Sequence, residues 1–300
     1  MNRRMRLLAA LGAAALGILG PGRAQTGRPA TVADDAGGTF TLGETPRRIV
    51  SLAPNITEIL FALGLGDRVV GVTRYCDFPP EARAREKIGG FIDPSVEKIR
   101  ALAPDLVIAY RGNPWEVLNR LKALRTPVFI LDIGQRLEAV PETIAKIGKI
   151  TRREDEARAL LASLDRTYRK AAAAAGRAVS RPRVFLSLSG KDLMTAGRAS
   201  YLHDLIERAG GANVAAAVSK PWAAYSRERL VRDDPDVVVI MAPSAADFAA
   251  GRARFEAQPG LAALRAVRAG RVRFLDENTA SRIGPRLYAA FAELVRIIHE

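Results

Sequence analysis

The sequence predicts an α/β protein made of two doubly wound α/β lobes, joined by a single long rigid helix, with a ligand cleft between the lobes. Two observations predict this fold class. Short apolar segments alternate with helical segments on both sides of residues 151–176, a pattern typical of parallel sheets that are covered on both faces. Residues 151–176 themselves repeat apolar residues at helical spacing, and a helix of about 23 residues spans roughly 35 Å, enough to connect two lobes.

The predicted connecting helix has recognisable signals at both ends. Thr151 and Glu154 have the spacing of a capping box at its start. Gly176 and Pro182 are residues that stop a helix. We therefore expect a helical linker over residues 141–180 that includes the connecting helix.

The first 45 residues are expected to lie outside both lobes. In residues 1–24, three arginines precede an apolar run at 7–19, and small residues stand at Gly22 and Ala24. This is the pattern of a signal peptide cleaved near Ala24, and the run is too short to cross a bilayer. Because no cysteine stands at the cleavage site, we expect an exported, periplasmic protein without a lipid anchor. Residues 25–45 predict an extended lead-in.

The two lobes are expected over residues 46–140 and 181–300. Asn55 and Glu58 would cap the first helix, Ser95 and Asn113 would begin the next two, and Pro285 would begin the last. The strands expected in the first lobe are 48–52, 69–72, 105–110 and 128–131. Those expected in the second lobe are 184–188, 236–241 and 271–275.

A short pattern occurs once in each lobe. Glu97 follows Ser95, and Glu228 follows Ser226, at the same spacing. Seven residues after each glutamate, a Pro-Asp pair begins an apolar strand, and an aromatic residue stands six residues before it. An acid in the first turn of a helix is stabilised by the helix dipole, which explains either glutamate alone. Their symmetric placement favours a second role, pairing with basic residues of a two-fold symmetric partner.

The loops that follow the strands supply the candidate ligand site. Ligands of doubly wound sheets bind beyond the carboxyl ends of the strands, and aromatic residues in such loops suit a large, flat, partly apolar ligand. The alternative is that these rings close small apolar cores beneath the loops. The candidate ligand-binding residues are Asn55, Tyr75, Phe91, Arg111, Met194, Trp222 and Arg282.

Three segments together resemble a known family: RIVSLAPNITEILFALGLGDRVVGVTRYCDFPPEA, IDPSVEKIRALAPDLVIAYRG and PWAAYSRERLV. They are similar to the periplasmic substrate-binding proteins of ABC importers for vitamin B12, haem and ferric siderophores, and most similar to the vitamin B12 binders. The resemblance runs from about residue 46 to the end of the chain.

The resemblance implies a monomeric carrier that delivers a corrinoid to a dimeric ABC permease with its ATPase subunits. Glu97 and Glu228 match the positions that dock arginines of the permease. Tyr75 and Trp222 match aromatic residues that contact the corrinoid. Phe91 stands where the most similar proteins have tryptophan, and Met194 where they have phenylalanine. No resident cofactor or metal is implied.

A haem or ferric-siderophore carrier of the same fold is the main alternative. Tyr75 could ligate haem iron through its phenolate, and Arg111 or Arg282 could bind carboxylates. A carrier of bare metal ions would need several converging ligands, and the chain has two histidines, His203 and His299.

Other classes of function have weaker support. The formal net charge is +14, but the arginines are scattered among acids, so we expect no nucleic-acid partner. An exported hydrolase is the remaining alternative, yet the sequence has no GxSxG elbow, no GxxxxGK[ST] phosphate loop and no HExxH motif. We therefore expect no catalytic residues. The single cysteine, Cys76, cannot form a disulfide within the chain and is expected to be a small buried residue.

Overall fold

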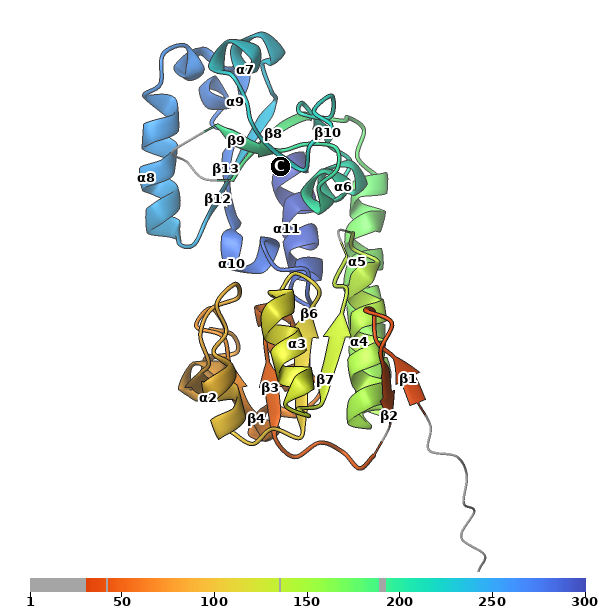
Figure 1. Ribbon diagram of the computed structural model, residues 1–300. Helices are drawn as coiled ribbons and strands as arrows, with labels where there is room; N and C mark the ends of the chain where they lie inside the picture. Colours follow the sequence, from red (N-terminus) through yellow and green to blue (C-terminus); the bar gives the residue numbers. More distant parts are fainter. Residues whose placement is uncertain (1–30, 42, 135, 189–192) are drawn as a thin grey trace, which may run out of the picture.

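The computed structural model describes residues 31–41, 43–134, 136–188 and 193–300. Figure 1 shows two α/β lobes, one above the other, with the long helix α5 running beside both. The predicted signal peptide, residues 1–24, lies outside the described residues. Within the described ranges, no helix is both long and apolar enough to cross a membrane.

The described part of the lead-in forms a small antiparallel hairpin that is fastened to the first lobe. Phe40 packs edge-on against Phe129, with ring centroids 5.8 Å apart. The Asp35 carboxylate accepts a hydrogen bond from the backbone N–H of Asp132 at 2.8 Å and forms an ion pair with Lys146. The two hairpin strands are β1 (Thr31–Ala33) and β2 (Thr39–Thr41).

The first lobe is a five-stranded, wholly parallel sheet with the strand order β5-β4-β3-β6-β7. Alternate residues of its strands face opposite ways, so Leu106 packs with helices α1 and α4, whereas Val107 packs with α2 and α3. The sheet is thus covered on both faces, as predicted. The strands are β3 (Ile49–Ser51), β4 (Val69–Val72), β5 (Glu86–Lys87), β6 (Leu106–Tyr110) and β7 (Val128–Leu131). The helices are α1 (Pro54–Ala62), α2 (Val96–Ala101), α3 (Trp115–Ala123) and α4 (Ala139–Thr151).

The second lobe has a mixed sheet with the strand order β11-β9-β8-β12-β13, and β10 also pairs with β8. Strands β9 and β11 run antiparallel to their neighbours, whereas β8, β10, β12 and β13 are parallel. The sequence predicted the parallel strands β8, β12 and β13 but placed β9 and β11 in loops, because three residues are too few to show alternation. The strands are β8 (Arg183–Ser187), β9 (Met194–Ala196), β10 (Ala212–Asn213), β11 (Trp222–Ala224), β12 (Val237–Ala242) and β13 (Val272–Asp276).

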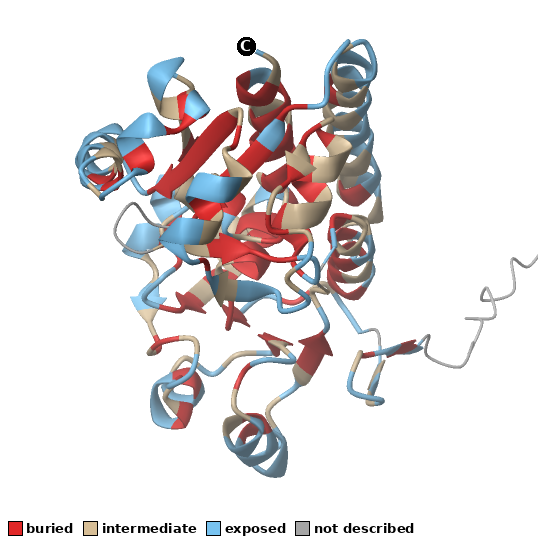
Figure 2. Ribbon diagram, turned by 90° about the horizontal axis from the view of Figure 1, so that it is seen from above, coloured by how far each residue is buried: buried red, intermediate tan, exposed pale blue. Residues whose placement is uncertain are grey.

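Helices cover both faces of the second sheet as well. Phe185 packs toward α7, α8 and α9, whereas its neighbours Val184 and Leu186 pack toward α6 and α11. Figure 2 shows the buried strands enclosed by helices whose outer turns are exposed. The helices are α6 (Tyr201–Arg208), α7 (Arg227–Asp233), α8 (Ala245–Glu256), α9 (Arg265–Arg268), α10 (Glu277–Ala280) and α11 (Leu287–His299).

Helix α5 (Glu154–Gly176) has the predicted length of 23 residues, but its predicted capping box is wrong. Helix α4 continues to Thr151, whose hydroxyl donates to the carbonyl of Ile147 at 2.6 Å. Arg152 then adopts a left-handed conformation with φ 55°, which reverses the chain before α5 begins. The Thr151 hydroxyl therefore belongs to the preceding helix and does not cap α5.

Helix α5 packs tightly against elements of both lobes. At its start, Gly148 of α4 allows close contact, since a Cβ atom there would lie 2.7 Å from the Cβ of Ala157. Farther along, the Tyr168 ring stacks on Phe291 of α11, with centroids 5.1 Å apart. One continuous apolar cluster runs from α1 and α4 of the first lobe, past α5, to α6 and α11 of the second. Because this core is continuous, α5 fixes the two lobes relative to each other.

Candidate functional site

A cavity of about 310 Å³ lies between the two lobes and is lined by residues of both. It lies beyond the carboxyl ends of β3 and β6, where a doubly wound sheet places its ligands. Four of the predicted ligand-binding residues line it: Asn55, Phe91, Trp222 and Arg282. The other lining residues are Ala53, Pro54, Tyr110, Ile133, Tyr201, Ser281 and Ile283.

Each lobe contributes one pair of aromatic rings to this cavity. In the first lobe, Phe91 and Tyr110 have ring centroids 5.5 Å apart and are inclined by 33°. In the second lobe, Tyr201 and Trp222 have centroids 5.9 Å apart and lie edge to face. Trp222 is 37% exposed, so much of its ring is free to contact a ligand. The cavity is thus bounded on two sides by aromatic surfaces.

Buried hydrogen bonds hold these rings in place. The Asn113 side chain donates to the carbonyl of Phe91 at 2.9 Å and accepts from the backbone N–H of Tyr110 at 2.8 Å. In the second lobe, the Tyr201 hydroxyl donates to the carbonyl of Ala280 at 2.9 Å, and burial raises the pKa of Tyr201. Burial likewise raises the pKa of Tyr110. Both phenols therefore stay neutral over the physiological pH range.

The sequence did not single out Tyr110 and Tyr201 as candidate ligand contacts. Tyr110 is the last residue of strand β6, and Tyr201 is the first residue of helix α6. Their positions in the sequence could have identified them, because the end of a strand and the start of the following helix both face the crevice of a doubly wound lobe.

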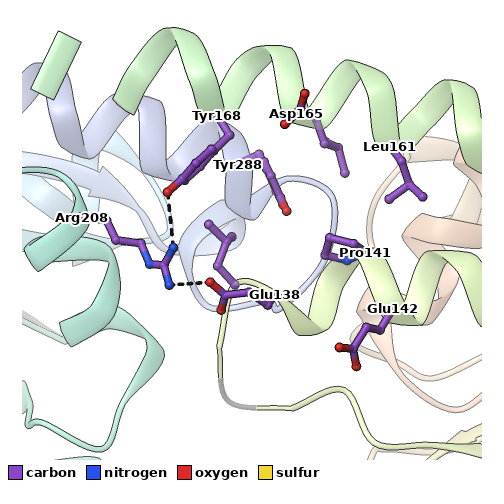
Figure 3. A pocket seen from close by; sticks show the side chains of 10 residues that line it. Glu138, Pro141, Glu142, Leu161, Asp165, Tyr168, Arg208 and Tyr288 are labelled. Carbon is purple, nitrogen blue, oxygen red and sulfur yellow. Dashed lines mark hydrogen bonds and ion pairs between the residues drawn. The ribbon is translucent and has the colours of Figure 1, made fainter. Parts of the chain in front are cut away.

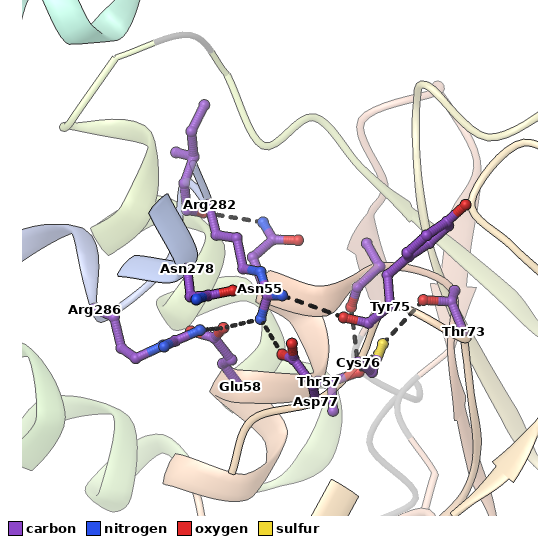
Figure 4. A network of polar contacts seen from close by, with 12 residues as sticks. Asn55, Thr57, Glu58, Thr73, Tyr75, Cys76, Asp77, Asn278, Arg282 and Arg286 are labelled. Atoms are coloured by element: carbon purple, nitrogen blue, oxygen red, sulfur yellow. Dashed lines mark hydrogen bonds and ion pairs between the residues drawn. The ribbon is translucent and has the colours of Figure 1, made fainter. Parts of the chain in front are cut away.

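An interlobe ion-pair network lies beside the cavity, consisting of Glu58 and Asp77 from the first lobe and Arg282 and Arg286 from the second (Figure 4). The Glu58 side chain is only 2% exposed. Its carboxylate accepts from Arg282 at 3.2 Å and from Arg286 at 2.6 and 3.1 Å. Asp77 accepts from Arg282 at 2.6 Å, and this hydrogen bond lowers the pKa of Asp77.

The network changes the roles predicted for Arg282 and Glu58. Arg282 lines the cavity as expected, but its guanidinium is already paired with two carboxylates, so it has no free charge to offer a ligand. Glu58 does not cap the first helix, which begins at Pro54 without a side-chain cap. The Arg286 guanidinium also lies over the Phe78 ring, 4.1 Å from its centroid.

Asn55 joins the two lobes rather than capping the first helix. Its side-chain amide donates to the carbonyl of Ile283 at 2.9 Å. The neighbouring Gly284 approaches so closely that a Cβ atom there would lie 3.1 Å from the Cβ of Asn55. Asn55 is therefore both a wall of the cavity and a contact across the lobe boundary.

Three predicted ligand-binding residues are not among the described residues that line the cavity. Tyr75 is 53% exposed, and in Figure 4 its ring points away from the ion-pair network. Arg111 is exposed and pairs with Asp132 at 3.3 Å. Met194 is partly buried on strand β9, where it pairs in register with Ala224 of β11.

Cys76, between Tyr75 and Asp77, is buried, with 1% of its surface exposed. The Thr57 hydroxyl donates to its sulfur at 3.2 Å, and the Thr73 hydroxyl lies 3.1 Å from the same atom. Burial raises the pKa of the Cys76 thiol. The thiol is therefore kept protonated and enclosed, as expected of a structural cysteine.

The repeated glutamates have matching local structures in the two lobes. The Ser95 hydroxyl caps α2 by accepting from the backbone N–H of Lys98 at 3.2 Å, and Ser226 caps α7 in the same way with Arg229 at 3.2 Å. Glu97 and Glu228 are exposed in the first turns of these helices. Hydrogen bonding to their own backbone amides lowers the pKa of both, so both carry a negative charge.

The described residues include no cluster of three or more His, Cys, Asp or Glu side chains able to hold a metal ion. His203 lies 3.1 Å from the Asn213 amide through its Nδ1 atom. His299 lies 2.7 Å from the carbonyl oxygen of Ala209 through Nε2. One ring nitrogen of each histidine is thus within hydrogen-bonding distance of a second-lobe residue, Asn213 or Ala209.

Comparison with known proteins places these features in context. A family model described as "Periplasmic binding protein" matches residues 49–279. A vitamin B12-binding protein of Pectobacterium carotovorum subsp. carotovorum (strain PC1) is 30% identical over 251 residues, covering 83% of this chain and 87% of the relative. An uncharacterised ABC transporter substrate-binding lipoprotein of Bacillus subtilis (strain 168) is 31% identical over 278 residues, covering 90% of this chain and 86% of the relative.

Solved structures show the same architecture. The periplasmic haem-binding protein from Roseiflexus sp. RS-1, in its apo form, superposes with a TM-score of 0.74 at 31% sequence identity. The match covers 86% of this chain and 98% of that one. Both chains therefore share the two-lobed arrangement around a cleft.

We predict that Glu58→Gln destabilises the protein by about 3 kcal/mol, because it leaves two partly buried arginines without their central carboxylate. Urea denaturation should show a lower midpoint. Glu97→Gln is the control, since its ion pair with Arg120 is exposed, and it should change stability by less than about 0.5 kcal/mol. Equal stability of Glu58→Gln and wild type would contradict a structural role for the network.

Proposed function

Because this chain belongs to the periplasmic binding protein family, we propose that it is the substrate-binding component of an ABC importer and that its ligand is a corrinoid. The observation that carries the ligand proposal is the cavity between two aromatic pairs, Phe91 with Tyr110 and Tyr201 with Trp222. A corrin ring is a large, nearly flat macrocycle, and aromatic surfaces on two sides suit such a shape. The vitamin B12-binding relative from Pectobacterium supports the same ligand class.

The charge of the cavity also favours a corrinoid. Arg282 is the one charged residue among the described lining residues, and Glu58 and Asp77 neutralise it. A ligand with amide side chains, such as vitamin B12, meets this environment without an unpaired charge. A ligand with free carboxylates would find no unpaired cation in the lining, and burying unpaired charge is costly.

The lining also favours binding over catalysis. Its described members include no histidine and no carboxylate that could act as a general base toward Ser281. We therefore propose a carrier without enzymatic activity, exported to the periplasm as the family implies.

The size of the cavity bears on how the ligand would be held. At about 310 Å³ it lies at the low end of the range for ligand pockets, and a corrinoid overfills it. Helix α5 and the interlobe network hold the lobes together, so we expect the macrocycle to bind edge-first, with its outer part in solvent.

A haem carrier is the second candidate, and two observations favour it. The haem-binding protein of Roseiflexus sp. RS-1 is as similar to this chain as the vitamin B12 binder is. The Tyr75 phenol is exposed and lies near the Arg74 guanidinium, 5.8 Å from the ring centroid. A tyrosine in this exposed position is accessible to haem iron, which tyrosine can ligate.

We predict that cyanocobalamin binds one to one and that Trp222→Ala weakens binding by about 1–3 kcal/mol, the usual scale for an aromatic anchor. Isothermal titration calorimetry measures both. Leu124→Ala is the matched control, because Leu124 is similarly exposed, at 41%, but lies at the far end of α3 from the cavity. It should leave the affinity unchanged. Saturable binding of haemin or a ferric siderophore, with no heat from cyanocobalamin, would instead establish the alternative carrier.

The docking proposal rests on Glu97 and Glu228. They sit at matching positions of α2 and α7, in different lobes (Figure 1), and neither lines the cavity. A carrier with this arrangement can engage both halves of a dimeric permease through charge-assisted hydrogen bonds with arginine.

We predict that Glu97→Ala combined with Glu228→Ala lowers binding to the permease, by more than the two single losses together, while ligand affinity stays the same. Pull-down with the purified permease, beside ligand titration, makes the comparison. The control pair is Glu116→Ala with Asp247→Ala, which removes first-turn acids from α3 and α8. Normal permease binding by the first double variant would leave both glutamates as helix-start acids only.

A further inference from the structure

A second cavity, of about 500 Å³, lies where helix α5 meets both lobes (Figure 3). It shares no lining residue with the interlobe cavity. Its walls come from α4 and the residues before it, from one face of α5, from the end of α6 and from the start of α11. The lining residues are Leu137, Glu138, Pro141, Glu142, Leu161, Leu164, Asp165, Tyr168, Arg208 and Tyr288.

The Tyr288 side chain lines this cavity, and its hydroxyl is directed into it. Tyr288 is 7% exposed, and Figure 3 shows its hydroxyl pointing toward the side where Glu138 and Pro141 lie. No hydrogen bond joins this hydroxyl to any other described residue. The ring itself is fixed by edge-to-face packing on Tyr168, with centroids 6.4 Å apart. The hydroxyl oxygen is not among the buried atoms that lack a partner, so it is accessible from the cavity and can form a hydrogen bond with a ligand.

One buried polar atom of this cavity's lining residues lacks a hydrogen bond to any described residue. One oxygen of Glu138, Oε1, accepts from Arg208 at 2.5 Å. The other, Oε2, is buried and accepts no hydrogen bond from any described residue, although Arg136 lies 3.7 Å away. A carboxylate oxygen can only accept. The missing partner of Glu138 is therefore a donor.

The charges around the cavity favour a cationic donor. Its lining holds three carboxylates and one guanidinium, and one of the carboxylates, Asp165, pairs with Arg169 outside the lining at 2.8 Å. Arg208 is already shared by Glu138, Asp204 and the Tyr168 hydroxyl. Glu142 forms no ion pair with any described residue. Burial and the nearby negative charge of Glu138 raise the pKa of Tyr288 to about 12.

We propose that this cavity is a second binding site, for a protonated amine carried on an apolar body. The ammonium would donate to Glu138 Oε2 and to the Tyr288 oxygen, while the hydrocarbon part packs on Leu161, Leu164 and Tyr168. Such a ligand supplies the missing donor to Glu138 Oε2, forms a hydrogen bond with the Tyr288 hydroxyl and fills the apolar part of the cavity. Because α4 belongs to the first lobe and α6 and α11 to the second, the bound amine would contact both lobes and stabilise their observed arrangement.

The test uses three probes that differ only in their terminal group: 4-phenylbutylamine, 4-phenyl-1-butanol and 4-phenylbutyrate. We expect the amine to bind one to one in calorimetry and to raise the melting temperature, because it binds the folded state. The alcohol should bind at least tenfold more weakly, and the carboxylate should not bind. Equal binding of the amine and the alcohol would overturn the proposal.

Variants locate the site. Tyr288→Phe should weaken amine binding about fivefold, the scale of one net hydrogen bond. Leu164→Phe should abolish it by filling the cavity, and Glu142→Gln, at the exposed rim, should weaken it by removing charge. Glu154→Gln, an acid at the start of α5 outside the cavity, is the matched control and should have no effect. Amine binding that survives Leu164→Phe, or is lost in Trp222→Ala, would place the ligand elsewhere and contradict the proposal.

Discussion

The arrangement of the two lobes depends on the ion pairs that the buried Glu58 carboxylate forms with Arg282 and Arg286. Transferring a charged group out of water costs several kcal/mol unless it is paired and hydrogen-bonded. Glu58 meets that requirement only through Arg282 and Arg286, which belong to the other lobe. The free-energy cost of burying the Glu58 charge in the first lobe is therefore offset only when the second lobe is packed against it. Separation of the lobes here would leave three charged groups to be solvated again.

Helix α5 acts with this network to fix the shape of the interlobe cavity. The helix joins the lobes through a continuous apolar core, and the network joins them through charge beside the cavity. With two attachments of different kinds, the aromatic pairs on either side of the cavity have a defined separation. A preformed cavity reduces the loss of conformational freedom on binding, which suits the ligand-binding role that we propose for it.

The sequence predicts the fold well where the signals are local. Apolar strands, helix periodicity and the length of α5 are properties of short windows, and the structure confirms them. The capping box at Thr151 failed because the hydroxyl of that residue has a competing acceptor within α4. Strands β9 and β11 were missed because each is only three residues long. They are recognised in the structure by their antiparallel pairing with each other.

The candidate site is less predictable because it depends on contacts between distant residues. Asn55 and Glu58 have the residue types of helix caps, and nothing near them in sequence shows that their partners are Ile283, Arg282 and Arg286. The same distant pairing neutralises Arg282. By contrast, Phe91 and Trp222 were predicted to line the cleft because they lie near the ends of strands, and both line the interlobe cavity.

A crystal structure of the protein with cyanocobalamin would test the central claim most directly. The account predicts the corrin ring between the aromatic pairs of the two lobes, in contact with Trp222 and Phe91, while Glu58 keeps its hydrogen bonds to Arg282 and Arg286. A ligand bound away from these rings, or a complex in which that ion-pair network is broken, would contradict it.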